Sequence, residues 1–159
     1  GDVYKRQEYI DQADYKQKPD KIDIFINKLG LAKTWGECED KIYFAIECKR
    51  INSLIDINHY IGDLIKFTNR RYIELRLPFE GQLGFIESNS LSNQQIVEDI
   101  NSKLERSSCI VTKQLLNSCL INQNISSTYK SIHKRNTDNK ELFSIYHILL
   151  VTYLAHCAK

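Results

Sequence analysis

The chain has 159 residues, of which 42% are apolar and 26% charged, and its formal net charge is +2. This composition is typical of one ordinary globular domain and excludes a long disordered chain, while so small a charge does not by itself indicate a polyanionic partner. Five scattered cysteines without a C-x-x-C pair indicate neither a zinc knuckle nor a disulfide framework, and fit a reducing cytoplasm.

Near the start of the chain, Asp2-Val-Tyr-Lys-Arg-Gln7 is the translation of a transposon-end sequencing adapter, and the chain contains no methionine. We therefore expect residues 1–7 to be an adapter-derived scar, with a native hexapeptide as the alternative. On the scar interpretation, residues 8–159 form a single domain that is truncated at its N-terminus.

Two β-strands are expected in the first third of the chain, after a polar segment, Glu8–Lys18, that resembles the tail of a helix. The isoleucines of Ile22–Ile26 alternate with other residues at the period of a strand. Leu29–Lys41 reads as a connection. Lys41–Lys49 is a second strand with apolar residues on both faces up to Glu47, which is typical of a central strand covered by helices on each side.

Two amphipathic helices are expected next. Ser53 with Asp56 three residues later resembles a capping box, and apolar residues then recur at the helical period over Leu54–Ile65. Ser92 is expected to cap a second helix, whose apolar face holds Ile96, Val97, Ile100 and Leu104.

The rest of the chain gives weaker patterns. Gln82–Glu87 is expected to be a short strand after the irregular segment Arg70–Gly81. Ser107–Ser131 is ambiguous, with a short strand at Cys109–Val111 followed by helix and loop as one interpretation. Leu142–Tyr153 is expected to be a strand. The apolar run to which it belongs is interrupted by polar residues too often to be a membrane span. The pattern predicts an α/β fold with a sheet of four to five strands flanked by helices.

The end of the second strand carries a group of residues suited to chemistry on phosphate esters. Glu47 and Lys49 lie two apart and point to one face, while Cys48 offers its backbone carbonyl between them. Asp23 on the neighbouring strand is expected to supply a second carboxylate, and Asp20 is the alternative, placed in the preceding turn. Such oxygen ligands suit Mg²⁺, which can neutralise a phosphate and activate water. The lysine can position that water and stabilise negative charge in the transition state.

Glu-x-Lys alone is a common pattern, and the alternative is an exposed pair of charges at the end of a strand. The combination with an acid inside the preceding β-run is more specific, because a charge within a buried strand is costly unless it is paired or bound to a metal.

The two segments Lys21–Ile26 and Ile42–Ile51 resemble the motifs of the PD-(D/E)xK nuclease superfamily, the restriction-endonuclease-like proteins. A looser resemblance to a bacterial and phage-associated group of these proteins continues through Tyr60-Ile-Gly-Asp63, Phe67, Arg70-Arg71-Tyr72, Gly81–Ile86, Tyr129, His133, Arg135 and His147. It spans most of the chain, but only the first two segments are motifs with assigned chemistry.

The resemblance implies a mixed central sheet with helices on both faces and a nuclease that depends on Mg²⁺ or Mn²⁺. By motif position, Asp23 and Glu47 carry over as metal ligands together with the backbone carbonyl of Cys48, and Lys49 as the catalytic lysine. Many members add a glutamate from a helix before the first core strand, and in this chain that helix is truncated or replaced by the adapter.

Basic residues follow the motif at Arg50, Arg70 and Arg71, and a second basic cluster contains Lys134 and Arg135. Both clusters are suited to contacting phosphates, and we expect them to bind nucleic acid. A solvated charged face is the alternative meaning of such runs.

Three further residues could belong to a site. His133 and His147 could act as acid, base or metal ligand, although His147 lies inside an apolar run and reads as a core histidine. Cys48 could be taken for a nucleophile, but the sequence places no partner base, so a small buried residue is the better interpretation.

The sequence thus predicts a cytoplasmic, Mg²⁺-dependent endonuclease of the restriction-endonuclease-like fold that acts on DNA in restriction or anti-phage defence, with no membrane partner. The alternative is a catalytically inactive module of the same fold that binds nucleic acid or serves as a scaffold. The sequence leaves open DNA or RNA as substrate, and whether the chain acts alone, as a homodimer or with a partner subunit.

Overall fold

The structure of the chain is a computed structural model that describes residues 3–5, 23–26, 44–69, 79–136 and 141–152. Its elements in chain order are β1 (Val3–Lys5), β2 (Ile24–Ile26), β3 (Phe44–Ile51), α2 (Ile57–Asn69), β4 (Phe79–Ile86), α3 (Asn93–Arg106), β5 (Val111–Ser118), β6 (Thr128–Lys134) and β7 (Leu142–Val151).

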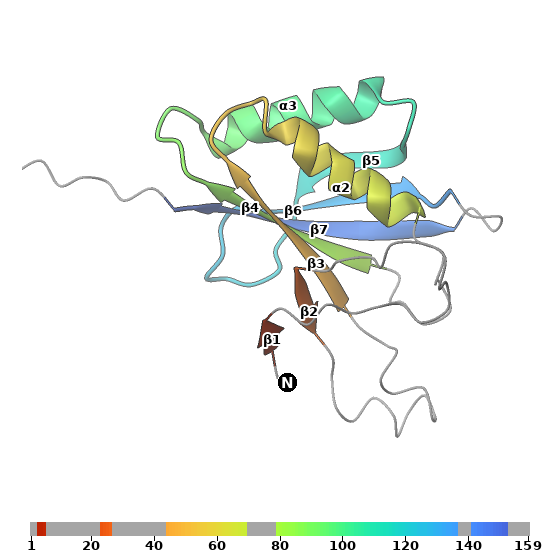
Figure 1. Cartoon of the computed structure of the whole chain (residues 1–159), viewed down its shortest axis with the longest axis horizontal. Helices are drawn as coiled ribbons and strands as arrows, with labels where there is room; N and C mark the ends of the chain where they lie inside the picture. The colour runs from red at the N-terminus through yellow and green to blue at the C-terminus, as the bar shows by residue number, and fades with distance from the viewer. Residues whose placement is uncertain (1–2, 6–22, 27–43, 70–78, 137–140, 153–159) are drawn as a thin grey trace, which may run out of the picture.

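One mixed sheet runs through the described part of the chain, with the strand order β1-β2-β3-β4-β7-β6-β5 (Figure 1). The central strands β3, β4 and β7 are parallel, and the outer pairs are antiparallel. Helix α2 forms the crossover from β3 to β4, as parallel neighbours require. The α/β class and the mixed sheet are as predicted from the sequence. The five strands of seven to ten residues match the predicted four to five, and the described residues add two further strands of three residues, β1 and β2.

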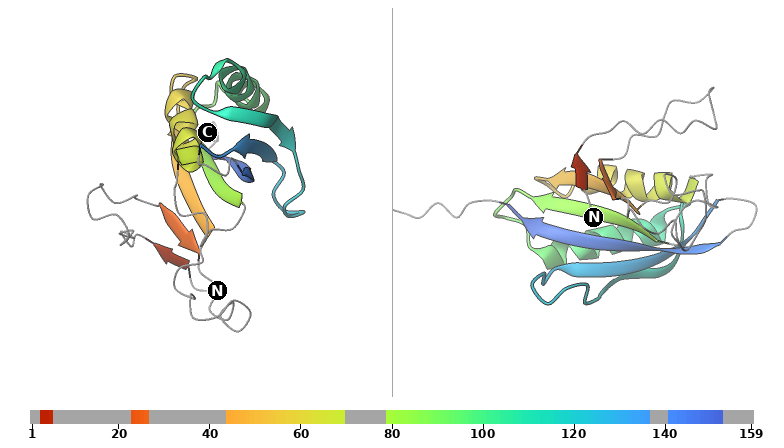
Figure 2. Two further views of the ribbon diagram at one scale, coloured as in Figure 1. Left: turned by 90° about the vertical axis from the view of Figure 1, so that its right-hand side faces the viewer. Right: turned by 90° about the horizontal axis from the view of Figure 1, so that it is seen from below.

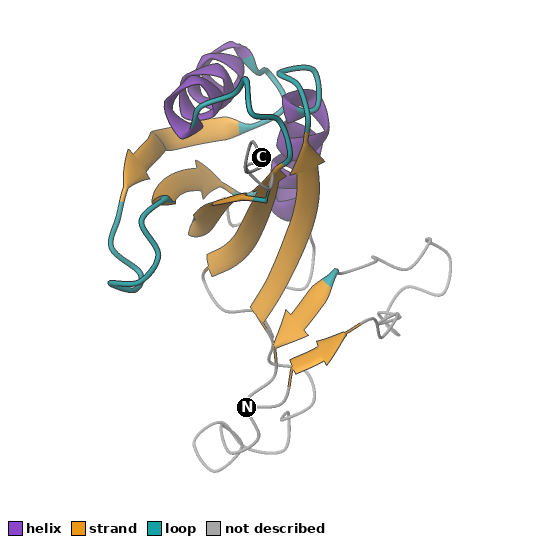
Figure 3. Cartoon of the chain, turned by 90° about the vertical axis from the view of Figure 1, so that its left-hand side faces the viewer, coloured by secondary structure: helices purple, strands orange, loops and turns teal. Residues whose placement is uncertain are grey.

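Within the described residues, α2 and α3 lie on the same face of this sheet, which we call the covered face (Figure 3). Alternate residues of β3 point there, and Ala45, Glu47 and Ile51 are buried. The prediction of helices on both faces is therefore not matched in the part of the chain that the structure describes. Strand β5 curls towards α3 (Figure 2), where the side-chain amide of Asn101 donates to and accepts from the backbone of Leu116.

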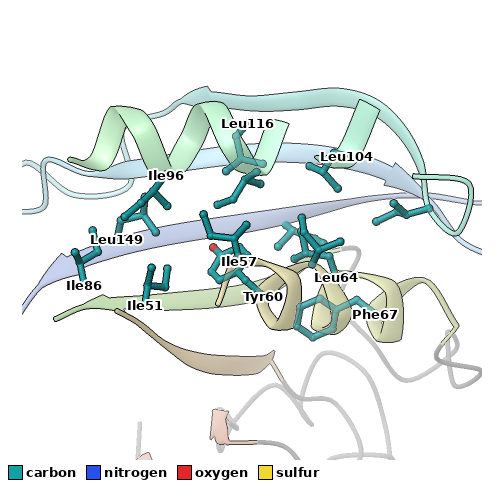
Figure 4. Packing of buried hydrophobic residues seen from close by; sticks show 14 of the residues in the cluster. Ile51, Ile57, Tyr60, Leu64, Phe67, Ile86, Ile96, Leu104, Leu116 and Leu149 are labelled. Atoms are coloured by element: carbon teal, nitrogen blue, oxygen red, sulfur yellow. The ribbon is translucent and has the colours of Figure 1, made fainter. Parts of the chain in front are cut away.

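The apolar core lies between the two helices and the covered face (Figure 4). Helix α3 contributes Ile96, Ile100 and Leu104 at helical spacing, and each is at least 98% buried. Burial of a side chain of this size contributes roughly 1.5–3 kcal/mol to stability. The core residues that α2 and the strands contribute include Ile57, Tyr60, Leu64, Phe67, Ile51, Ile86, Leu116 and Leu149.

The beginning of each helix tests the capping predictions. Ser92 caps α3 as predicted, and the structure adds a capping box with Gln95. Helix α2 begins at Ile57, three residues later than predicted, because the Asp56 carboxylate accepts hydrogen bonds from the backbone N–H groups of Asn52 and Ser53 and holds that segment as a turn.

Gly84 of β4 allows α2 to approach the sheet closely. A Cβ at this position would lie 2.7 Å from Leu149, 3.0 Å from Ile51 and 3.5 Å from the ring of Tyr60. The first of these distances is shorter than side chains tolerate, so the helix, β3 and β7 could not pack together around a larger residue.

The opposite face of the sheet carries an apolar groove with a volume of about 440 Å³. Its walls include Phe44 of β3, Phe79 and Leu83 of β4, and Tyr146 and Ile148 of β7. This side of β3 and β4 is therefore apolar as predicted, although neither α2 nor α3 covers it.

The prediction for residues 107–131 is wrong. This segment forms the antiparallel strands β5 and the start of β6, with a loop between them and no helix in its described residues. Lys134 of the second basic cluster is the last residue of β6. The predicted strand at Leu142–Tyr153 is confirmed as β7. None of the described helices is both long and apolar enough to cross a membrane.

Candidate active site

The pairing of β2 with β3 brings Asp23 to the predicted motif. Ile24 pairs with Ile46 and Ile26 with Phe44, so one further step of this antiparallel register puts Asp23 across from Glu47. Asp23 immediately precedes β2, and its Oδ2 accepts a hydrogen bond of 2.8 Å from the backbone N–H of Cys48. The carboxylate therefore lies against the segment of β3 that joins Glu47 to Lys49.

The backbone carbonyl of Cys48 faces the same way. In an extended strand the N–H and C=O groups of one residue point to the same neighbouring strand. Since the N–H of Cys48 reaches Asp23, its carbonyl also points to the β2 side of β3. The two carboxylates and the carbonyl named from the sequence are thus gathered around one short stretch of β3.

Glu47 and Lys49 share the covered face of β3, as their two-residue spacing predicts. Glu47 is only 4% exposed, whereas the side chain of Lys49 is 28% exposed. A buried carboxylate has to be compensated by charge or hydrogen bonds, so this position on β3 is specialised and is not a solvated strand end. The alternative of an exposed pair of charges does not describe Glu47.

The thiol of Cys48 points to the opposite face of β3 from Glu47 and Lys49 and is half-buried. Burial, followed by the negative charges of Asp23 and Glu47, raises its pKa to about 11. The thiol is therefore protonated at neutral pH, which agrees with the interpretation of Cys48 as a packing residue and not a nucleophile.

Helix α2 adds an acidic residue that the sequence did not single out for a role. Asp63 is 1% exposed, and its two oxygens lie 2.8 Å from Lys49 Nζ and 2.9 Å from Lys66 Nζ. The contact between Lys49 and Asp63 is an ion pair, but its angles are not those of a hydrogen bond. Its signal was present in the sequence, because Asp63 falls within the buried stripe that runs from Tyr60 to Phe67.

Strand β4 places Gln82 beside Glu47 in the parallel register. Gln82 is 1% exposed, and among the described residues neither its Oε1 nor its Nε2 has a hydrogen-bond partner. A glutamine inside a β-run was the only sequence signal for this position.

Arg135, which was predicted to contact nucleic acid, lies inside the molecule. The residue is 3% exposed, its Nη2 lies 3.7 Å from Oε1 of Glu80, and its Nη1 donates to the backbone carbonyl of Phe67 (3.0 Å). The guanidinium also lies 4.2 Å from the ring centre of Phe143. It joins β4, β7 and the end of α2, and its guanidinium already has partners in Glu80 and the carbonyl of Phe67.

The other predicted nucleic-acid-binding residues are dispersed. Arg50 is exposed and forms a two-pronged pair with Glu87, with distances of 2.6 and 2.7 Å, which lowers the pKa of that carboxyl. Lys134 lies half-buried at the end of β6. Arg70 and Arg71 lie outside the described residues, as does the alternative acid Asp20.

Both histidines lie in a buried polar chain on the covered face, so the interpretation of His147 as a core histidine is confirmed. Nδ1 of His147 is 2.8 Å from the Tyr60 hydroxyl, and its Nε2 is 2.8 Å from Ser131 Oγ. The same hydroxyl of Ser131 is 2.7 Å from Nε2 of His133. Burial lowers the pKa to about 3 for His147 and to about 4 for His133, so both are neutral at pH 7.

Within residues 3–5, 23–26, 44–69, 79–136 and 141–152, no three side chains of His, Cys, Asp or Glu are grouped so that they could hold a metal ion. The set predicted from the sequence has a different composition, with two carboxylates and one backbone carbonyl. That set stays a prediction, and the structure shows one of its carboxylates, Asp23, hydrogen-bonded to the backbone of Cys48.

Comparison of the chain with protein-family models, with curated proteins and with solved structures finds no match. The functional assignment therefore depends on the residues and their geometry.

Proposed function

We propose that this chain is a metal-dependent nuclease of the PD-(D/E)xK type that hydrolyses phosphodiester bonds in DNA with Mg²⁺ or Mn²⁺. The observation that carries the proposal is the hydrogen bond from the Cys48 amide to Asp23, because it brings the acid of one strand to the Glu-Cys-Lys segment of the next. Restriction or anti-phage defence is the biological setting that the sequence resemblance suggests.

The donors near Cys48 fit a hard divalent cation. Asp23, Glu47 and the carbonyl of Cys48 offer oxygen atoms only, and two of the three carry negative charge. The thiol of Cys48 does not compete, since its pKa of about 11 keeps it protonated. When bound, the cation would neutralise the phosphate and activate water.

The remaining chemistry falls to Lys49. Its ammonium group can hold the attacking water and stabilise the negative charge that develops on the phosphate. The ion pair with Asp63 restricts where this ammonium lies, and the 28% exposure of Lys49 leaves part of the side chain open to a substrate. Lys66 also pairs with Asp63, and its side chain is 62% exposed. It therefore adds positive charge near the proposed site, which would attract the phosphates of DNA.

The experiment is cleavage of plasmid and linear DNA by the purified chain, in Mg²⁺, in Mn²⁺ and in EDTA. We expect cleavage with either cation and none in EDTA. Lys49→Ala should reduce the rate by at least about a hundredfold with an unchanged circular dichroism spectrum.

Lys103→Ala is the matched control. Lys103 pairs with Asp99 at 2.6 Å on α3 and has a similar exposure of 30%, but it lies on the other helix. This variant should cleave at the wild-type rate. Equal cleavage by Lys49→Ala and wild type would refute the role of Lys49.

Metal titration separates this proposal from an inactive module of the same fold. A nuclease should show a Mn²⁺-dependent change in fluorescence or stability that Asp23→Asn and Glu47→Gln abolish. DNA binding that is identical in EDTA and in both variants would instead identify a binding or scaffold module.

A further inference from the structure

Gln82 lies in a row of polar residues that crosses the parallel centre of the sheet. The register pairs Gln82 with Glu47 of β3 on one side and with His147 of β7 on the other. Paired residues point to the same face, so all three side chains lie on the covered face. They are buried, with exposures of 4% for Glu47, 1% for Gln82 and 0% for His147.

The side-chain amide of Gln82 is buried, but among the described residues it has no hydrogen-bond partner. Roughly nine in ten buried polar groups have a partner in folded proteins, and a buried amide without one is destabilising. His147 cannot supply a partner, because its two ring nitrogens are committed to Tyr60 and Ser131. In the part of the chain that the structure describes, both Oε1 and Nε2 of Gln82 remain without a partner.

We infer that Gln82 is a substrate-positioning residue of the proposed nuclease site, and this inference rests on the proposed function. Its Oε1 accepts a hydrogen bond from the attacking water, and its Nε2 donates one to a phosphate oxygen. Neighbouring strands lie about 4.8 Å apart, so the amide is within reach of groups held at Glu47.

An amide is suited to this place because it offers both a donor and an acceptor without adding charge. A third carboxylate beside Asp23 and Glu47 would repel the phosphate. An apolar residue would pack more favourably on the covered face but could hold neither water nor phosphate. The cost of leaving the amide unpaired in the free protein is thus matched by a function in the complex.

The test is Gln82→Met, which keeps the length of the side chain and removes the amide. In metal-free protein without DNA, we expect the thermal midpoint to rise by roughly 2–6 °C, because an unsatisfied buried polar group has been removed. With DNA and Mg²⁺, we expect kcat/KM to fall by about tenfold to a hundredfold. Mn²⁺ affinity in the absence of DNA should change by less than about threefold, since Gln82 contacts substrate and not the cation.

Gln94→Met is the control. Gln94 is exposed on α3, where its Nε2 donates to Glu98, and its replacement should leave the midpoint and the cleavage rate unchanged.

Three results would overturn the inference. A lower thermal midpoint for Gln82→Met would show that the amide has a structural partner. A raised midpoint with unchanged cleavage would show that the amide does not contact substrate. If the wild-type protein neither cleaves DNA nor responds to Mn²⁺, the proposed function fails, and the inference fails with it. If the wild-type protein cleaves DNA and Gln82→Met cleaves it equally fast, only the inference fails.

Discussion

Helices α2 and α3 cover the same face of the sheet and have 13 and 14 residues, but they bury different kinds of side chain. The buried residues of α3 are all apolar, namely Ile96, Ile100 and Leu104. Those of α2 include the carboxylate of Asp63 and the hydroxyl of Tyr60. The residues that face the two helices differ in the same way. The polar residues Glu47, Gln82 and His147 share the covered face with α2. Helix α3 packs with the apolar residues Ile110 and Leu116.

This difference separates the residues that stabilise the fold from those that form the proposed site. An apolar interface such as that of α3 gives the larger gain in stability per buried residue. Buried charges and unpaired amides reduce that gain, and proteins retain them mainly at functional sites. We therefore read α3 as the stabilising helix and α2 as the helix that positions the proposed site.

Acid should produce the largest effect, and it should act on the polar half. In the folded protein the pKa values of His147 and His133 lie at about 3 and about 4, whereas both are near 6.5 in the unfolded chain. Below pH 6.5 the unfolded chain binds protons that the folded protein does not, so the free energy of unfolding decreases as the pH falls. At pH 5 the loss should reach up to about 4 kcal/mol for the two residues.

Urea titrations at pH 7, 6 and 5 measure this loss, in a range where carboxyls of lowered pKa such as Asp56 and Glu87 stay ionised. Unfolding free energies that are equal at pH 7 and pH 5 would contradict the assignment of two neutral buried histidines.

Ile100→Ala tests the apolar half. Ile100 is fully buried in α3, and its truncation should lower the free energy of unfolding by about 3 kcal/mol through lost burial and a residual cavity. Because α3 carries no residue of the proposed site, DNA cleavage per folded molecule should be unchanged. A large decrease in cleavage under conditions where the variant is fully folded would show that the two halves are not separable.

Asp63→Asn should have the smallest effect on stability and a specific effect on activity. The variant removes the charge that faces Lys49 and Lys66, so we expect cleavage to fall about tenfold as Lys49 loses its fixed position. Both ammonium groups can still reach solvent, so stability should change by no more than about 1 kcal/mol.

Asp99→Asn is the matched change on α3, where the carboxylate pairs with Lys103. It should not affect cleavage. If Asp63→Asn cleaves as fast as Asp99→Asn, the ion pair on α2 has no part in the reaction.

Sequence periodicity predicted the elements that alternate cleanly or carry a cap. The strand with Glu47, the Ser92 cap and strand β7 belong to this group. Strand β5 was missed for a physical reason. It lies at the end of the sheet, its ladder with β6 is irregular at two places, and Leu116 is its only buried residue, so its sequence carries little two-residue alternation.

The proposed site divides in the same way. The proximity of Asp23, Glu47 and Lys49 could be predicted because it needs only the two-residue period and one antiparallel neighbour. Asp63 and Gln82 come from the crossover helix and the parallel strand after it, and no local pattern gives their register. The burial of Arg135 was equally hidden, since its partner Glu80 lies 55 positions earlier in the chain.

Strand β2, which leads out of Asp23, pairs with β3 over three residues, whereas β4 pairs with β3 over six. Few ladder hydrogen bonds permit a strand to detach without global unfolding, so amide protons of β2 should exchange with solvent deuterium well before those of β4. The first acid of the proposed site would then dock and undock on a core that stays intact. Competence for cleavage would follow from this local equilibrium, which a bound cation would shift towards the docked strand.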